Sequence, residues 1–246
     1  MMRNAVPLLA IFILGACTPV YCQPRVPSPI YGVTVDNVSN LPDIVESLKR
    51  LSHKPTTRIV FDLHVPASRY VAASSKIHAV SYVMGEVVDS FFMAKYNVGD
   101  YLTRTSNYLK MLGDNVDIWE IGNEINGDWL GNTSDVVAKM TGAYDRVKAA
   151  GKTTELTLYY NQGCAKHPEN EMFTWAQANI PERKKQGLDY VLVSYYEDDC
   201  KGLQPDWPSV FERLRVMFPQ SNLGMGECGS KYASPGKRHM SNATMR

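Results

Sequence analysis

The stretch DIWEIGNEINGDW, residues 117–129, decides how the fold of this 246-residue chain is interpreted. Apolar and acidic residues alternate up to the pair Asn123-Glu124, and a Gly-containing turn and Trp129 follow. A run of β-forming residues that ends on a carboxylate has two interpretations. Either Glu124 is one more solvated charge at a strand end, or it lies at the mouth of an active site.

Similar runs, rich in β-branched and aromatic residues, recur along the chain. They span residues 30–36, 56–64, 79–89, 116–124, 155–162, 188–198 and 222–229. Most are continuous apolar runs, which is typical of parallel strands buried on both faces. In the fourth run Trp119 and Ile121 are expected to pack in the core, and Glu120 is expected to be structural.

Amphipathic helical patterns lie between the strand-like runs, at residues 41–52, 98–112, 133–151, 169–180 and 206–218. Asn40 is the predicted N-cap of the first helix, and Thr133 or Ser134 that of the third. Gly113 and Gly151 are placed to end helices. Serial alternation of strand and helix fits either an open doubly wound sheet or a (β/α)8 barrel.

Two observations favour the barrel. No GxGxxG or GxxxxGK[ST] phosphate loop, as nucleotide-binding doubly wound folds carry, follows any of the runs. Polar residues gather instead at the C-terminal ends of many strands, where a barrel assembles one site from all its loops. These residues are Asp36, Asp62, His64, Glu86, Asp89, Asn123, Glu124, Asn161, Tyr196 and Glu227.

The predicted fold class is therefore α/β, a (β/α)8 TIM barrel with seven βα units visible. The residues after Glu227 contain no strand or helix pattern, so the eighth unit is predicted to be missing, through truncation or because the barrel is open. An open parallel edge leaves backbone groups unpaired, and we expect low stability of the chain for this reason.

Glu124 and Glu227 are the candidate catalytic pair. They end the fourth and seventh strand-like runs, which face one another across the mouth of a closed barrel. Two carboxyl groups across a cleft can divide the work of glycoside hydrolysis, one as proton donor and the other as nucleophile. Their surroundings must then push the two pKa values apart.

Three segments together resemble the large clan of retaining (β/α)8 glycoside hydrolases, which includes cellulases, mannanases, xylanases and β-glycosidases (clan A). They are IGNE at 121–124, VLVSYYED at 191–198 and GMGECG around Glu227. The resemblance implies that Glu124 is the acid/base, that Asn123 binds the sugar 2-hydroxyl, and that Glu227 is the nucleophile. It also implies that Tyr196 donates its hydroxyl to Glu227, with no metal and no organic cofactor.

The chain departs from the clan at two positions. Ser194 stands where a His often precedes the strand-six Tyr, and Ile125 replaces the usual Pro after Asn-Glu. These departures leave the sugar and the linkage open. They also leave open a catalytically inactive, cell-surface glycan-binding barrel, and a hydrolase or lyase of another type on this fold. The sequence contains no G-x-S-x-G nucleophile elbow that would support a hydrolase of another type.

Weaker candidates surround the pair. Trp129 is a predicted sugar-stacking platform, because a flat ring matches a pyranose face, and Asn161 is a predicted substrate ligand. Arg58, within the second run, is expected to pair with Glu227 from beneath or to form a buried structural ion pair. The side chains of Asp36, His64 and Glu86 either line the cleft or are solvated.

The N-terminal pattern, Arg3 followed by an apolar run, is typical of an export signal. We predict a signal peptide or lipoprotein signal at 1–22, a Pro-rich tether at 23–29, the TIM-barrel catalytic domain at 30–230 and an irregular tail at 231–246. ILGAC fits a lipobox that lipidates Cys17, and cleavage near Cys22-Gln23 is the alternative. The expected location is secreted or in the cell envelope.

Export also changes the interpretation of the remaining cysteines, because an exported chain meets an oxidising compartment. A Cys164–Cys200 bridge with Cys228 left over and three buried free thiols are both compatible with the sequence. The net charge of +1, without a basic run, argues against a nucleic-acid partner. We expect a monomer that binds an oligo- or polysaccharide and contacts a membrane only through a lipid at Cys17.

Overall fold

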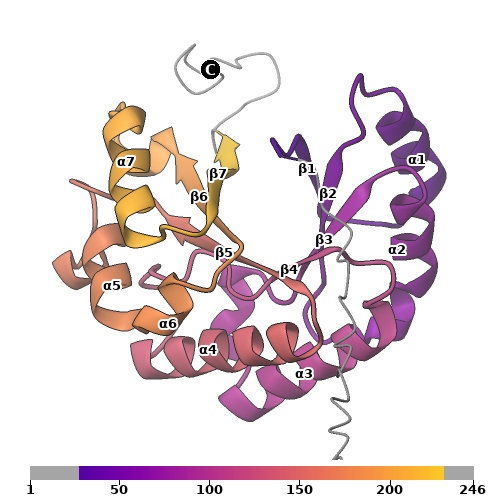
Figure 1. Ribbon diagram of the computed structural model, residues 1–246, viewed down its shortest axis with the longest axis horizontal. Helices are drawn as coiled ribbons and strands as arrows, with labels where there is room; N and C mark the ends of the chain where they lie inside the picture. The colour runs from indigo at the N-terminus through magenta and orange to yellow at the C-terminus, as the bar shows by residue number, and fades with distance from the viewer. Residues whose placement is uncertain (1–27, 230–246) are drawn as a thin grey trace, which may run out of the picture.

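Parallel strands hydrogen-bonded in chain order form a nearly closed barrel in the computed structural model, which describes residues 28–229 (Figure 1). The strands are β1 (Gly32–Val35), β2 (Thr56–Val60), β3 (Tyr82–Glu86), β4 (Ile118–Glu120), β5 (Thr153–Tyr159), β6 (Tyr190–Tyr196) and β7 (Asn222–Gly229). Each falls in or overlaps a predicted run, and together they confirm the predicted barrel with seven visible βα units.

Helices cover the outside of the sheet (Figure 1). They are α1 (Leu41–Lys49), α2 (Val71–His78), α3 (Val98–Leu112), α4 (Thr133–Ala149), α5 (Met172–Asn179), α6 (Glu182–Lys185) and α7 (Trp207–Met217). Short 3-10 turns are η1 (Ala67–Arg69), η2 (Ser90–Lys95), η3 (Pro168–Asn170) and η4 (Glu197–Cys200). The sequence missed α2, whose VAASSKIH segment is short and built largely of small residues, and the four-residue α6.

Asn40 is the N-cap residue of α1 as predicted, although its side chain donates to the carboxylate of Asp43 at 2.6 Å and makes no capping bond to the backbone. The predicted cap of α4 was wrong: the helix begins at Thr133 itself, and Asn132 takes the cap position. Gly113 does end α3 as predicted.

The two edges of the sheet are β1 and β7, which are not paired with each other in the described part of the chain (Figure 1). A pocket of about 530 Å³ lies between them and reaches the barrel interior, where Met84 and Tyr190 line it. The low stability expected from such an open edge stays a prediction. Trp119 in β4 and Ile121 directly after it are fully buried, as predicted for core residues.

Arg104 on α3 fixes the loops that follow β2 and β3. Its guanidinium donates to the carbonyls of Phe61, Asp62, Val65 and Val87 at 2.8–3.0 Å, and its side chain is buried. Four backbone acceptors thus receive hydrogen bonds from one residue, as buried carbonyls require. The upper rim of the barrel, where the predicted site lies, is held to the outer helix layer by this contact.

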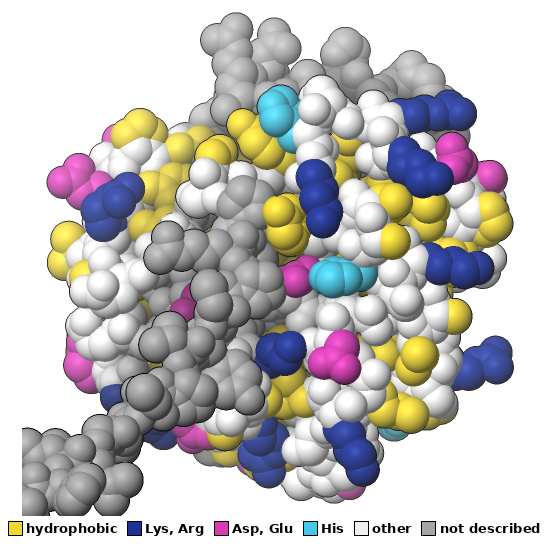
Figure 2. All heavy atoms as spheres, turned by 45° about the vertical axis from the view of Figure 1, so that its right-hand side comes forward, with side chains coloured by type: hydrophobic (Ala, Val, Ile, Leu, Met, Phe, Trp, Pro, Cys, Tyr) yellow, Lys and Arg dark blue, Asp and Glu magenta, His cyan; other side chains and the backbone are white. Residues whose placement is uncertain are grey.

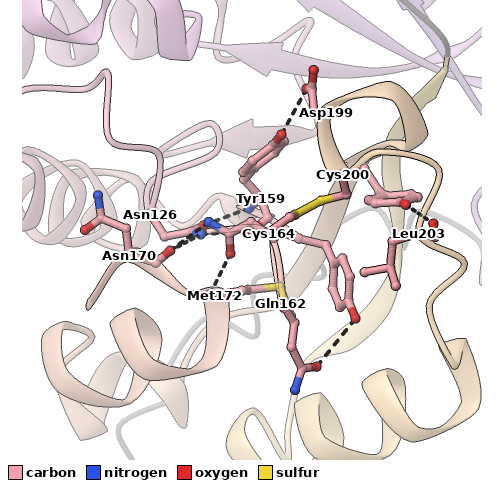
Figure 3. Close-up of a disulfide and its surroundings, with 12 residues drawn as sticks. Asn126, Tyr159, Gln162, Cys164, Asn170, Met172, Asp199, Cys200 and Leu203 are labelled. Atoms are coloured by element: carbon pink, nitrogen blue, oxygen red, sulfur yellow. Dashed lines mark hydrogen bonds between the residues drawn. A yellow bond between two sulfur atoms is a disulfide. The ribbon is translucent and has the colours of Figure 1, made fainter. Parts of the chain in front are cut away.

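A disulfide joins Cys164, after β5, to Cys200 at the end of η4 (Figure 3). The two Cα atoms are 5.3 Å apart, and Cys228 is free and exposed. Of the two alternatives for the cysteines, the Cys164–Cys200 bridge is therefore confirmed, and the alternative of three buried free thiols was wrong.

Nearby, the Asn126 amide accepts from the Tyr159 nitrogen and donates to its carbonyl, which ties the loop after β4 to the end of β5.

Several predicted features lie outside the described residues. They are the export signal at 1–22 with Cys17 and Cys22-Gln23, nearly all of the tether at 23–29, and the tail at 231–246.

Within residues 28–229 no helix combines the length and the apolar composition that crossing a bilayer requires. Figure 2 shows Lys and Arg side chains spread over one face among acidic and apolar ones rather than gathered in one patch.

Replacing Arg104 by Met is expected to lower the free energy of unfolding by about 3 kcal/mol or more. Each buried acceptor left without its donor costs about 1–3 kcal/mol; the carbonyls of Phe61 and Val87 lose theirs, whereas those of Asp62 and Val65 keep a second donor. Urea unfolding followed by circular dichroism measures the change. Lys110→Met, at an exposed position of the same helix, is the matched control and should stay within about 0.5 kcal/mol of wild type. Equal stability of both variants contradicts the anchoring role.

Candidate active site at the carboxyl ends of the strands

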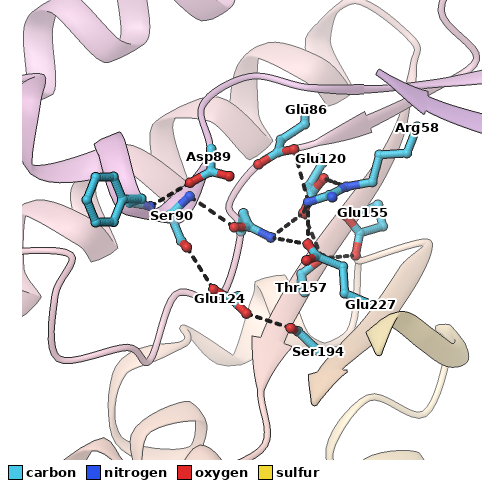
Figure 4. A network of polar contacts seen from close by, with 12 residues as sticks. Arg58, Glu86, Asp89, Ser90, Glu120, Glu124, Glu155, Thr157, Ser194 and Glu227 are labelled. Atoms are coloured by element: carbon cyan, nitrogen blue, oxygen red, sulfur yellow. Dashed lines mark hydrogen bonds and ion pairs between the residues drawn. The ribbon is translucent and has the colours of Figure 1, made fainter. Parts of the chain in front are cut away.

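Glu124 follows β4 in an unusual backbone conformation. Its φ is +48°, in the left-handed region that non-glycine residues rarely adopt and that is common at functional sites. The side chain is 8% exposed, and its carboxylate accepts the hydroxyls of Ser90 at 2.7 Å and Ser194 at 2.5 Å (Figure 4). Glu124 is thus held by the start of η2, which follows β3, and by β6.

Burial raises the pKa of Glu124 above its ordinary value. The hydroxyls of Ser194 and Ser90 oppose this shift because they stabilise the ionised form, while the charges of Glu227 and Asp89 add to it. The net shift is upward. A carboxyl that keeps its proton to a higher pH is suited to donating that proton to a leaving group.

Glu227 reaches the interior of the barrel through a β-bulge. β6 and β7 pair residue for residue as far as Val193 and Met225, and the next pair is Ser194 with Glu227. Gly226 is the extra residue, and a Cβ there would lie 3.0 Å from the Cβ of a β6 side chain. Because side chains alternate along a strand, this one-residue shift turns Glu227 to the same side as Ser194.

The carboxylate of Glu227 accepts from three side chains, of which Arg58 is labelled in Figure 4. Tyr196 donates to Oε2 at 2.6 Å, Asn123 donates to Oε1 at 3.1 Å, and Arg58 forms an ion pair with Oε1 at 2.8 Å. Burial and this hydrogen bond together raise the pKa of Tyr196, so its hydroxyl stays a donor. Three donors, one of them cationic, hold the Glu227 carboxyl group in one orientation.

Asn123 links the two glutamates. Its Oδ1 accepts from the backbone nitrogen of Ser90 at 2.9 Å, and its Nδ2 also lies 3.2 Å from Glu120 Oε1. Ser90 therefore binds Asn123 through its backbone and Glu124 through its side chain, while Asn123 binds Glu227. The two glutamates belong to one continuous polar network on the carboxyl side of the sheet (Figure 4).

Arg58 lies beneath this network. Its Nε is 2.5 Å from Glu120 Oε2, and its Nη2 is 3.1 Å from Glu86 Oε2 and 2.8 Å from Glu227. Both expectations for Arg58 hold, since it pairs with Glu227 and also forms a buried ion pair. Glu86 is completely buried, so both expectations for it were wrong.

The remaining predicted residues lie at the edge of the site. Trp129 is 37% exposed and meets Tyr159 edge to face at 5.2 Å between ring centres, beside a pocket of about 160 Å³. Asn161 also lines this pocket, but its amide donates to the Asn170 carbonyl and accepts from the Met172 nitrogen. Any effect of Asn161 on substrate binding would act through the loop that it holds. Asp36 and His64 are exposed.

Sequence reasoning missed Ser90, Glu155 and Thr157 as members of the network. Glu155 and Thr157 lie inside β5 rather than at its end. The signal was present in the alternation ELTLY at 155–159, which places these two side chains on one face of the strand and the leucines on the other. Ser194 was noticed only as a departure from the clan.

Comparisons with known proteins support the fold. No protein-family model and no curated protein sequence matches the chain. Among solved structures, the FMN-binding beta-glucuronidase from Facaelibacterium prausnitzii L2-6 is similar, with a TM-score of 0.52 and 14% sequence identity. The match covers 81% of this chain but only 30% of the glucuronidase chain. At this identity the likeness shows a shared TIM-like barrel that a glycoside hydrolase also uses.

Replacing Ser194 by Ala is expected to raise the pKa of Glu124 further. The hydroxyl stabilises the carboxylate form, so its removal favours the protonated form. The carboxyl-carbon resonance of Glu124, assigned with Glu124→Gln and followed through a pH titration by NMR, reports the shift. Ser90→Ala should act in the same direction, and Ser75→Ala, at an exposed position on α2, should have no effect. An unchanged or lowered pKa in Ser194→Ala contradicts the assignment.

Proposed function

We propose that this protein is a glycoside hydrolase that acts with retention, with Glu227 as nucleophile and Glu124 as acid/base. One observation carries the proposal. Within a single network, Glu227 forms an ion pair and receives two neutral donors, whereas Glu124 is buried against two hydroxyls and has no cation of residues 28–229 within ion-pair distance. Opposite surroundings of two carboxyls are what separate roles require.

In the first step Glu227 attacks the anomeric carbon, and the bond from that carbon to the leaving oxygen breaks. Glu124 gives its proton to the leaving oxygen, which departs as an alcohol, and a glycosyl ester with Glu227 remains. The contacts of Tyr196, Asn123 and Arg58 hold the Glu227 carboxylate in one orientation before the attack. Positioning of this kind lowers the entropic part of the barrier.

In the second step Glu124, now ionised, removes a proton from a water molecule. The water oxygen attacks the anomeric carbon, the ester bond breaks, and Glu227 is released as a carboxylate. Ser90 and Ser194 donate to the ionised form of Glu124, so they stabilise it in this step. Glu124 thereby returns to its protonated state.

The proposed substrate is an oligo- or polysaccharide. Trp129 offers a partly exposed ring for stacking on a sugar beside the site, and Asn123 is the proposed ligand of the 2-hydroxyl. Export to the cell envelope or medium, lipidation at Cys17 and a monomeric state belong to the same proposal. They suit an enzyme whose polymeric substrate lies outside the cell.

A screen of aryl glycosides with wild type, Glu124→Gln and Glu227→Gln tests the proposed roles. We expect turnover by wild type, a loss of about 10²–10⁴-fold in Glu124→Gln for substrates that need acid catalysis, and no detectable turnover in Glu227→Gln. Glu212→Gln, at an exposed position on α7, is the control and should match wild type. Glycan binding without turnover in wild type favours a glycan-binding barrel instead, and equal activity of all variants contradicts the proposal.

A further inference from the structure

Four carboxyl groups surround a single guanidinium beneath the site. Glu86, Glu120 and Glu155 are each at most 1% exposed, and with Glu227 they surround Arg58 (Figure 4). If all four were ionised, the group would carry three uncompensated negative charges away from water. Buried carboxyls in such surroundings keep their protons rather than their charges.

Hydrogen-bond donors identify Glu120 as an ionised member. Its carboxylate receives two contacts from Arg58 at 2.5 and 3.0 Å, one from Asn123 at 3.2 Å and one from Thr157 at 2.7 Å. The Arg58 fork takes both oxygens, with Nε on Oε2 and Nη2 on Oε1, and Asn123 and Thr157 add two donors on Oε1, a set of charge-assisted contacts that suits a carboxylate. Glu120 is therefore the principal counter-ion of Arg58.

Thr157 identifies the protonated member. Its Oγ1 lies 2.7 Å from Glu120 Oε1 and 3.0 Å from Glu155 Oε1, yet a hydroxyl has one hydrogen to donate. Since Glu120 has no proton, the hydrogen in the second contact must come from Glu155. Within the described residues the other oxygen of Glu155 has no hydrogen-bond partner, and neither oxygen lies within ion-pair distance of a cation.

We propose that Glu155 is a neutral carboxylic acid and that Glu155 and Thr157 are positioning residues for Glu227. Glu155 donates to Thr157, Thr157 donates to Glu120, and Glu120 holds Arg58 so that its Nη2 reaches Glu227. The relay runs from β5 through β4 and β2 to β7. Its consequence for catalysis rests on the proposed function, whereas the protonation of Glu155 does not.

The surrounding charges agree with this assignment. Burial is the largest effect and raises the pKa of Glu155 well above its ordinary value, and the charges of Glu120 and Glu227 act in the same direction. Arg58 opposes them, as does the Thr157 hydrogen bond. Burial raises the pKa of Glu86, on β3, well above its ordinary value, and the charges of Glu120, Asp89 and Glu227 add to the shift while Arg58 opposes it. Among the described residues neither Glu86 oxygen has a hydrogen-bond partner, although Oε2 forms an ion pair with Arg58.

The pH dependence of thermal unfolding tests the protonation without any substrate. A carboxyl that holds its proton only in the folded state stabilises the protein below its unfolded pKa, near 4.3, and this contribution is lost as pH rises towards the folded pKa. The amide of Glu155→Gln donates to Thr157 but does not titrate. The Tm of Glu155→Gln relative to wild type should therefore rise by about 3–5 °C per pH unit above about pH 5. A flat or falling difference overturns the proposal.

NMR of the carboxyl carbons provides a second readout that needs only folded wild type. The Glu155 resonance, assigned with Glu155→Gln or, if that variant does not fold, Glu155→Met, should stay at the protonated position at pH 7. A resonance that moves to the ionised position near pH 4–5 overturns the assignment.

Thr157 variants test the positioning role. Thr157→Ser keeps the hydroxyl and should keep kcat, whereas Thr157→Val removes it and should lower kcat about 3- to 10-fold with KM within about twofold. Equal kcat in both variants overturns the relay. If wild type turns over no glycoside while Glu155 stays protonated, the proposed function fails and the assignment of Glu155 stands.

Discussion

The ion-pair contacts of Arg58 are the interaction on which the site depends. Its guanidinium contacts carboxylates from β3, β4 and β7, so three strands that are distant in sequence meet at one cation. Burial alone would lower the pKa of Arg58, but Glu120 and Glu86 raise it well above its ordinary value, and the charge persists. That charge is the shared counter-ion of Glu120 and Glu227 inside the barrel, and we propose that Glu155, which lies outside its ion-pair distance, is neutral.

Two local departures from regular structure turn the two catalytic candidates into the polar network above Arg58. The positive φ of Glu124 turns its side chain away from the β4 direction and towards Ser90 and Ser194. The bulge at Gly226 turns Glu227 inward. Neither glutamate would be presented by an unbroken strand. Regular barrel geometry thus supplies the frame, and the chemistry depends on the two irregular positions.

The sequence predicted the parts of the structure that have a local signature. Buried parallel strands are continuous apolar runs, so the positions of β1 to β7 were readable, as was α3 over residues 98–112. The strand-end polar residues predicted Glu124, Asn123, Tyr196 and Glu227 as neighbours. Contacts between distant strands have no such signature. The burial of Glu86 and the relay through Glu155 and Thr157 arise only when β2, β3, β4 and β5 lie side by side.

The central claim is that Glu227 forms a covalent bond to the sugar, while Glu124 donates a proton to the leaving oxygen and later removes one from water. A panel of 2-deoxy-2-fluoroglycosyl fluorides tests it most directly. The 2-fluorine slows both formation and hydrolysis of the glycosyl ester, whereas the good fluoride leaving group speeds formation alone, so the ester accumulates. Intact mass spectrometry followed by peptide mapping should find one added sugar on Glu227 and none in Glu227→Gln. A sugar on another carboxylate, or hydrolysis with inversion and no labelled protein, would contradict the account.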